Sequence, residues 1–403
     1  MTPPPVRFLD PTTAPHVMTL VAQASIAALA MNVFLPSLPT MTAYFDTDYA
    51  VMQLSVSLYL LVNALLQLFV GAISDRYGRR PVMIAALIGF ILATIGTLLA
   101  TSALVFLLFR MAQAVVVTAM VVSRASIRDV LDEAQSASRI GYVTMGMAIV
   151  PMIAPAIGGV LDEIFGWRGS FGLMLLAGLA VLALTWRDMG ETKSERSSSM
   201  FGVLRELPEL MRARRFWGYC GTATLASGAF FAYLGGAPFV GASVFGMSPA
   251  TLGIFFGAPA VGYALGNFMS GRYAARVGIN RMILLGCAVA FGGMLALLIL
   301  SLLMPLRPIL FFGLFVFVGL GNGMLLPSAT SGMMSVRPHL AGTASGIGGA
   351  IMIGGGAALS ALAGAVLTPE SGATPLIWVM VTTTGLGFLP LLYVIRREAQ
   401  LSA

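Results

Sequence analysis

Three polar side chains that could do chemistry lie inside long apolar stretches of the sequence: Asn32, Arg110 and Gln113. An arginine at the centre of a bilayer costs about 2.5–3.5 kcal/mol, so its side chain should face the protein interior and have a partner. Arg110 could hold an anionic group of a ligand, or it could brace helices through polar groups and backbone carbonyls. Counting along the segments puts Asn32 and Arg110 at similar depth, so we expect the Asn32 side-chain carbonyl to bind Arg110.

Further polar and aromatic side chains recur at helical spacing. Tyr59, Asn63 and Gln67 follow one another at intervals of four, so they share one face of a helix. A mostly apolar pocket with a few polar groups suits a small amphiphilic molecule. Taken singly, each aromatic residue is equally well explained by packing or by lipid contact. The candidate substrate-binding residues are Asn32, Tyr59, Asn63, Arg110, Gln113, Phe230, Tyr233 and Asn322.

No pattern in the sequence predicts an enzyme. It contains no Gly-x4-Gly-Lys-Ser/Thr phosphate loop, no hydrolase triad and no metal-ligand spacing. Cys220 and Cys287 lie in separate apolar segments and indicate neither a disulfide framework nor a metal cluster. We therefore expect no catalysis, no cofactor and no metal.

Membrane-spanning helices must position these residues. Of the 403 residues, 58% are hydrophobic and 10% are charged, against roughly 25% charged in soluble proteins. The long apolar stretches reach about 20 residues, which is enough to cross a hydrocarbon layer of about 30 Å. We expect an all-α membrane protein with about twelve spans. They lie at 17–39, 50–73, 82–101, 103–125, 140–161, 168–187, 215–240, 249–271, 281–303, 308–330, 342–367 and 374–395.

The net charge of +7 is a topology signal and does not predict nucleic-acid binding. If the N-terminus is cytoplasmic, the outer side holds only Arg168 and Arg307, and Arg110 lies within a span. The other 20 of the 23 basic residues then lie inside. This bias predicts a multi-pass protein of the cell inner membrane with both termini cytoplasmic. By the same assignment, all sixteen acidic residues lie in loops, tails or span ends.

A basic turn occurs twice, which indicates an internal duplication. Residues 71–80 read Gly-Ala-Ile-Ser-Asp-Arg-Tyr-Gly-Arg-Arg, and residues 271–281 repeat the pattern less faithfully, with Ala275 in the aspartate position. Duplicated membrane folds place the substrate site between their halves. The polar stretch between the repeats divides the spans six and six. We expect an N-terminal six-helix bundle at 1–187, a cytoplasmic linker at 188–214 and a C-terminal six-helix bundle at 215–403.

The first of these turns is a candidate conformational switch. Asp75 could pair with a neighbouring basic group or cap a helix N-terminus, and so hold one conformer. The alternative is a simple topology anchor. The candidate switch residues are Gly71, Asp75, Arg76, Gly78, Arg79 and Arg80. Prolines within the spans, among them Pro36, Pro155, Pro259 and Pro327, predict bends.

Together these motifs resemble the major facilitator superfamily, in particular its twelve-span drug exporters of the Bcr/CflA type. The turn at 71–80 matches the family's loop motif between spans 2 and 3, and Arg110 with Gln113 matches its span-4 motif. Residues 154–159, which include Pro155, Gly158 and Gly159, are similar to the span-5 motif associated with antiporters. Residues 231–240 and 166–168 also fit. The resemblance implies two pseudo-symmetric six-helix bundles around a central cavity.

The resemblance implies export of a small amphiphilic compound, drug-like or antimicrobial, by alternating access and in exchange for protons. One position departs from the family: Asn32 replaces the usual span-1 aspartate, and asparagine does not titrate. Coupling could then use Asp75 or a loop acid, or the charge of the substrate. One alternative is a uniporter or exchanger that binds a small organic anion or metabolite through Arg110. Another is a non-transporting membrane sensor or assembly factor.

We expect the protein to be a monomer.

Overall fold

The computed structural model describes residues 6–131, 133–193, 208–368 and 370–402. Within these ranges twelve helical stretches are long and apolar enough to cross a membrane, which confirms the predicted all-α fold. The first six comprise α1 (Val17–Asn32) with η1 (Leu35–Ser37) and α2 (Leu38–Tyr44), α3 (Tyr49–Tyr77), α4 (Arg79–Leu99), α5 (Ala103–Ala112) with η2 (Gln113–Val116) and α6 (Val117–Val130), α7 (Glu133–Phe165), and α8 (Arg168–Asp188).

The other six stretches follow the polar connection. They comprise α10 (Arg214–Phe239) with the π-helical turn η3 (Val240–Val244), α11 (Pro249–Phe256) with α12 (Ala258–Val277), α13 (Ile279–Leu303), α14 (Pro308–Leu314) with α15 (Val316–Val336), η4 (Pro338–Leu340) and α16 (Ala341–Val366), and α17 (Thr374–Leu386) with α18 (Phe388–Ser402). The predicted linker, 188–214, lies largely outside the described residues, so its bounds stay a prediction.

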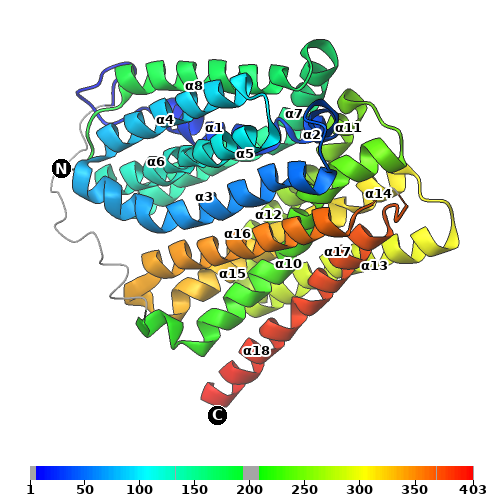
Figure 1. Cartoon of the computed structure of the whole chain (residues 1–403). Helices are drawn as coiled ribbons and strands as arrows, with labels where there is room; N and C mark the ends of the chain where they lie inside the picture. The colour runs from blue at the N-terminus through cyan, green and yellow to red at the C-terminus, as the bar shows by residue number, and fades with distance from the viewer. Residues whose placement is uncertain (1–5, 132, 194–207, 369, 403) are drawn as a thin grey trace.

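The helices form two bundles that lie one above the other in Figure 1. We call α1–α8 the N-terminal half and α10–α18 the C-terminal half. The turns at Gly78 and Gly278 mark one end of both bundles, which we call the Gly78 end. The opposite end carries Trp167 and the loops at 45–48 and 245–248, and we call it the Trp167 end.

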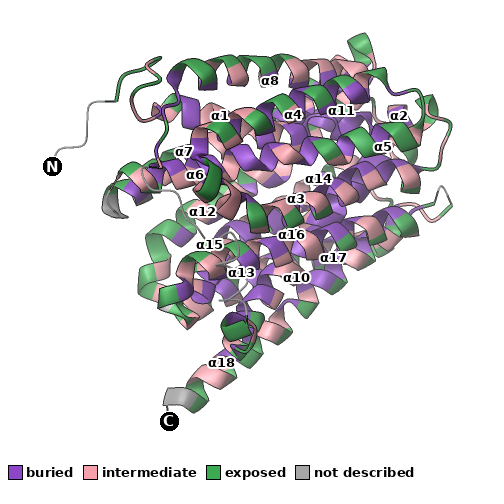
Figure 2. Cartoon of the chain, turned by 60° about the vertical axis from the view of Figure 1, so that its left-hand side comes forward, coloured by how far each residue is buried: buried purple, intermediate pink, exposed green. Residues whose placement is uncertain are grey.

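Large apolar side chains cover the outward faces of the bundles. Leu99, Leu303 and Phe268, for example, are 73%, 75% and 67% exposed. Figure 2 shows such exposed positions on the outer helix faces and buried residues between the helices. Apolar exposure on this scale is unfavourable in water but suits contact with lipid tails. The chain is therefore a multi-pass membrane protein.

Several spans are interrupted along their length, and proline explains only part of this. Pro36 lies in η1, and Pro259 is the second residue of α12 after the break at Gly257, as predicted. Pro155, in contrast, lies inside the continuous helix α7, and Pro327 lies inside α15. The 3-10 turn η2 contains no proline and follows directly after Arg110.

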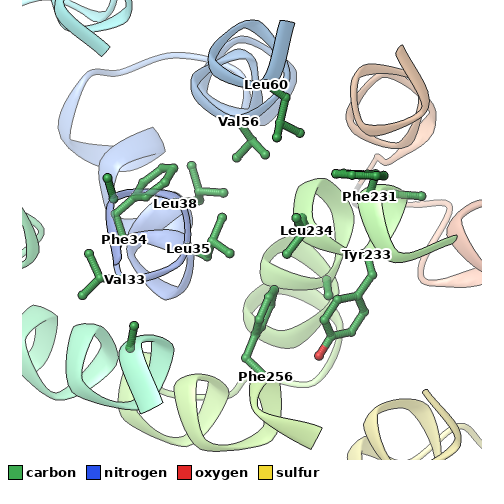
Figure 3. Packing of buried hydrophobic residues seen from close by; sticks show 14 of the residues in the cluster. Val33, Phe34, Leu35, Leu38, Val56, Leu60, Phe231, Tyr233, Leu234 and Phe256 are labelled. Carbon is green, nitrogen blue, oxygen red and sulfur yellow. The ribbon is translucent and has the colours of Figure 1, made fainter. Parts of the chain in front are cut away.

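The buried apolar core differs between the two ends. At the Trp167 end one cluster joins both halves, and Figure 3 shows Leu35 and Val56 from one half facing Leu234 and Phe256 from the other. Towards the Gly78 end a second cluster around Phe216 belongs to the C-terminal half, and among the described residues only Leu68 packs against it from the other half. The halves are therefore joined most firmly at the Trp167 end.

One acidic residue corrects the predicted span ends. The fifth span was expected to end at 161, but α7 continues to Phe165 and stops at Gly166, whose φ is +68°. Nothing in this last turn breaks a helix, and glycine adopts the positive φ that ends it. As a result Asp162 lies inside the helix and is only 5% exposed. The expectation that no span buries a carboxylate is wrong here and at Asp188, the fully buried last residue of α8.

Candidate functional site

Arg110 is fully buried at the end of α5 and is held by polar groups from three helices. Its Nη2 donates to Ala30 O at 2.8 Å, its Nε to Ser55 O at 3.3 Å and its Nη1 to Gln113 Oε1 at 2.8 Å. Backbone carbonyls and a neutral amide thus replace the acid that usually accompanies a buried arginine. Among the described residues no carboxylate lies within ion-pair distance of Arg110.

Two aromatic rings enclose the same guanidinium. Its central carbon lies 4.2 Å from the centre of the Phe34 ring and 4.0 Å from that of Tyr59. Both distances are well inside the range of about 6 Å for a cation–π contact, and such contacts strengthen when water is excluded. The Tyr59 hydroxyl is buried without a hydrogen-bond partner.

The predicted bond between Asn32 and Arg110 is not present. Asn32 is the last residue of α1, and its Nδ2 donates to Ala28 O one turn earlier at 2.8 Å. The carbonyl of Ala30 lies among the last four of the helix, which have no partner within the helix. Arg110 satisfies that carbonyl and not the Asn32 side chain. Both residues therefore stabilise the end of α1, but they do so separately.

Gln113, which shares a motif with Arg110, connects it to the neighbouring helix α4. Its Oε1 accepts from Arg110, and its Nε2 donates to Thr94 Oγ1 at 2.8 Å. Gln113 begins the 3-10 turn η2, and it is completely buried. This satisfied buried network fixes the side chains of Arg110 and Gln113 in one arrangement.

The predicted polar face on α3 exists, and its Gln67 end lies close to the other half. Tyr59 is buried beside Arg110, and Asn63 lies one turn further along and accepts from Gln67 Nε2 at 2.7 Å. A Cβ built on Gly349 of α16 would lie 3.9 Å from Gln67 Oε1. Because α3 packs along α16 in Figure 1, this face lies beside the boundary between the halves.

The predicted residues of the C-terminal half are placed differently. Tyr233 is fully buried among phenylalanines, with ring centres 3.9 Å from Phe315 and 4.6 Å from Phe256. Its hydroxyl has no hydrogen-bond partner, and the same is true of Asn322 Oδ1. Phe230 is half-buried and packs against the core. Among the described residues, no hydrogen bond, ion pair or ring contact joins these residues to Arg110. The predicted substrate-binding residues therefore do not all form one cluster in this conformation.

The turn after α3 is built on Gly78 and a carboxylate. Gly78 has a φ of +100°, a conformation that favours glycine, and it separates α3 from α4. The backbone nitrogen of Arg79 donates to Glu191 Oε1 at 2.9 Å, and that of Arg80 donates to Oε2 at 3.3 Å. The carboxylate thus caps the N-terminus of α4, where the helix dipole favours an anion.

The basic residues of this turn bind groups of the N-terminal half and of the segment just after it. The buried side chain of Arg79 pairs with Asp75 at 2.5 Å and with Asp129 at 2.9 Å. Arg80 donates to Trp186 O and lies over its ring, and Arg76 lies over the Tyr77 ring. A Cβ on Gly71 would meet nothing within 4 Å. A role of these residues in switching remains a prediction.

The second copy of the turn is held by a different acid. Gly278 has a φ of +92°, which repeats the geometry of Gly78. Glu398 of α18 accepts from Arg215, Tyr219 and Asn280 beside it. These side chains line a cavity of about 600 Å³ at the Gly78 end. The two halves therefore repeat the turn but anchor it with unrelated residues.

The antiporter-type motif on α7 lies where backbones approach most closely. A Cβ on Gly158 would lie 1.6 Å from Val33 O in the same half. A Cβ on Gly159 would lie 2.1 Å from Pro249 O in the other half. The contact is reciprocal, because a Cβ on Gly253 of α11 would lie 2.2 Å from Pro155 O. Only glycine permits this packing, which joins α7 and α11 at the Trp167 end.

Sequence reasoning missed the polar contacts that also close the Trp167 end. Tyr49 donates its hydroxyl proton to Gly235 O at 2.6 Å. Gln53 Nε2 donates to Ser360 O and Oγ, each at 2.8 Å. Both Tyr49 and Gln53 lie nearer the start of α3 than the polar residues predicted from the sequence, which begin at Tyr59. A signal was present, because Tyr49 and Gln53 are hydrogen-bonding residues four apart in the first turns of the same apolar span.

Comparisons with known proteins agree with this architecture. The family model described as Major Facilitator Superfamily matches residues 20–361. The chain is 30% identical over 372 residues to "Multidrug resistance protein D" of Escherichia coli, covering 88% of this chain and 89% of that protein. It is 29% identical over 326 residues to the "Chloramphenicol resistance protein" of Pseudomonas aeruginosa, covering 80% and 77%. A solved structure of a peptide transporter, in complex with sulfate, has a TM-score of 0.75 at 14% identity, covering 96% and 95%.

Proposed function

Because the chain belongs to the major facilitator superfamily of membrane transporters, we propose that it exports a small, neutral or cationic amphiphilic compound in exchange for protons. The relatives named for chloramphenicol and multidrug resistance support a drug-like or antimicrobial substrate. The main support for this proposal is the tight glycine-mediated contact that joins the two bundles at the Trp167 end. A transporter that alternates access needs such a separable contact.

The distribution of charge supports an orientation for this transporter. The Gly78 end carries the basic turns and the polar connection between the halves, so we place it in the cytoplasm of the cell, with both chain termini. The Trp167 end then faces outward. We propose that the two bundles, at 1–187 and 215–403, rock about their boundary while the linker at 188–214 joins them.

In this orientation we propose that the conformation is closed to the outside and opens towards the cytoplasm. At the Trp167 end the backbones of α7 and α11 touch, and Gln53 bridges to Ser360. Towards the Gly78 end, Leu68 alone among the described residues of the N-terminal half packs against the apolar cluster around Phe216, which supports an opening on that side. An exporter in this state would take up its substrate from the cytoplasm.

A substrate site between the halves is supported by α3. Its polar stripe offers the unpartnered Tyr59 hydroxyl and the Asn63 amide beside many apolar groups, which suits an amphiphilic compound. In this proposal Arg110 and Gln113 position Tyr59. Phe230, Tyr233 and Asn322 would line the site only after the aromatic cluster rearranges.

A second candidate function is exchange or uniport of a small organic anion. It is favoured by Arg110, a buried charge with no acid in ion-pair distance in the described part of the chain. It is disfavoured by the full burial of that side chain and by the three acceptors that already engage it. An anion would have to displace at least one of these bonds.

Binding and exchange measurements separate these functions. Purified protein is heated with chloramphenicol or with benzoate, and liposomes preloaded with each compound are tested for counterflow of the labelled form. We expect chloramphenicol to stabilise the protein and to exchange, since a ligand at 100 times its Kd stabilises by about 2.7 kcal/mol. Exchange of benzoate alone would favour the anion carrier. Stabilisation without exchange would favour a sensor.

A pair of tyrosine variants tests the site itself. Tyr59→Phe keeps the ring that covers Arg110 but removes the unpartnered hydroxyl, so we expect weaker chloramphenicol binding at unchanged folding. Tyr393→Phe makes the same chemical change on an exposed side chain of α18 and should have no effect. Equal binding by both variants would place the substrate away from Tyr59.

A further inference from the structure

The last turn of α7 carries two adjacent acids with different environments. Asp162 is only 5% exposed, and its Oδ2 accepts from Thr40 Oγ1 at 2.7 Å. Its Oδ1 is enclosed and has no hydrogen-bond partner. Ser37 Oγ faces the same carboxyl, but it forms no well-aligned hydrogen bond and is likewise enclosed. Oδ1 therefore lacks a hydrogen bond that would stabilise a negative charge on it.

The charges around Asp162 do not balance an ionised carboxylate. The charged group acting on it is Glu163, a second acid on the same helix. From α8, Arg168 binds Leu98 O and the Tyr44 hydroxyl and lies over Tyr44 and Trp167. No described basic group is within ion-pair distance of Asp162. An enclosed carboxylate without a cation is costly, and a proton removes the charge.

The remaining helices around this turn add no charge. Helices α1 and α11 contain no acidic, basic or histidine residue along their lengths, and α2 and η1 contain only the phenol of Tyr44. The charged residues of α6 follow Ser123, in its last two turns at the Gly78 end. The nearest helix of the other half, α11, therefore offers Asp162 no titratable group, and α12, which also packs on α7, carries Arg272 and Arg276 in its last two turns at the Gly78 end.

The same turn is part of the contact that closes the Trp167 end. Glu163 Oε1 accepts from the backbone nitrogen of Ala250 at 3.0 Å, in the first turn of α11 and in the other half. One turn earlier, Gly159 packs against Pro249. Closure thus draws α11 over the end of α7, whereas opening would expose this turn to water from outside.

From this geometry we propose that Asp162 is a proton-binding site of the outer gate, so that the closed Trp167 end holds one proton more than the open one. Asp162 takes the proton on Oδ1 from the outside water as the end closes and returns it there when the end opens. This inference rests on the proposed alternating access. It supplies a titrating group on a span in a chain that has Asn32 in place of the family aspartate.

The experiment measures closure directly and does not depend on transport. Spin labels are attached to Thr101→Cys and Pro305→Cys, two exposed positions on opposite halves at the Trp167 end. Both native cysteines are fully buried and should not react. Distances are recorded from pH 8 to pH 5 in detergent or liposomes. We expect the closed population to rise as the pH falls, by up to tenfold per unit, the limit for one proton.

Three variants identify the group that titrates. Asp162→Asn should remove the pH response and keep the end closed, because the amide mimics the protonated acid. Thr40→Val removes a hydrogen bond that favours the ionised form, so the midpoint should move to higher pH by about one unit. Glu163→Gln should keep the pH response, because its carboxyl is not the proposed site.

The outcomes separate this proposal from the proposed function. A pH response that survives Asp162→Asn, or that disappears with Glu163→Gln, would overturn the assignment to Asp162. Closure that does not vary with pH in the unmodified chain would also overturn it. In either case chloramphenicol exchange would be unaffected. Loss of exchange together with a normal pH response would instead contradict the proposed function.

Discussion

The adjacent glycines of α7 should have opposite effects when each is replaced by alanine. Gly159 faces Pro249 of the other half, so a methyl group there would press the two halves apart at the Trp167 end. Gly158 faces Val33 within its own half, so the same change there would damage the N-terminal bundle. We expect Gly159→Ala to shift the conformational equilibrium and Gly158→Ala to lower the unfolding temperature.

The size of the first effect follows from the contact. A Cβ at 2.1 Å from a backbone oxygen must retreat by about 1 Å, and the obstacle is the backbone of Pro249 and not a flexible side chain. Forcing an extra methyl into a packed contact costs about 1–3 kcal/mol. The closed state alone bears this cost, so the ratio of open to closed molecules should rise by about 5- to 150-fold.

Spin labels on Thr101→Cys and Pro305→Cys provide the assay. In the unmodified chain the short distance of the closed end should predominate, and Gly159→Ala should add a longer distance with little loss of thermal stability. Gly172→Ala is the matched control, because a Cβ there would meet nothing within 4 Å in α8. An unchanged distance distribution in Gly159→Ala would refute the reasoning, as would equal destabilisation by both α7 variants.

Three further predictions follow from single contacts, each measurable by thermal unfolding or by the same labels. Gly78→Ala should lower the unfolding temperature more than Gly278→Ala, because both have positive φ but only the first added Cβ would collide with Glu191, at 2.4 Å; the strain alone is about 1–3 kcal/mol. Arg110→Lys should destabilise the protein and abolish transport, since one ammonium cannot replace the planar fork and each orphaned buried acceptor costs about 1–3 kcal/mol. Gln53→Ala removes two hydrogen bonds between the halves, so the closed state should lose about 1–2 kcal/mol relative to the open state. The spin labels should then report a larger population at the longer distance.

The fold was predictable because each span can be recognised from its length and its apolar composition. The turn at Gly78 and its weaker copy at Gly278 repeat in sequence, and the structure gives both the same backbone geometry. The pairing of Arg110 with Gln113 was also predictable, because residues three apart on a helix share a face.

Other features depend on neighbours that the local sequence does not reveal. The partner of Arg110 on α1 is the backbone carbonyl of Ala30. Every residue has such a carbonyl, so the amino-acid sequence does not identify which one accepts the hydrogen bond. The break at Gln113 contains neither glycine nor proline. Asp162 was placed at a span end by hydropathy, but its burial comes from the tertiary approach of Thr40 and of the other half.

The direct test of proton-linked export is accumulation of chloramphenicol by liposomes that contain the unmodified chain and have an acidic lumen. Chloramphenicol is neutral, so the pH gradient by itself does not trap it. Protein molecules inserted with the Gly78 end outward should raise the chloramphenicol concentration in the lumen above that outside. A protonophore should abolish this accumulation. In liposomes without protein, the concentrations inside and outside should only become equal. Faster equilibration without accumulation would contradict the proton-linked account and identify the chain as a uniporter.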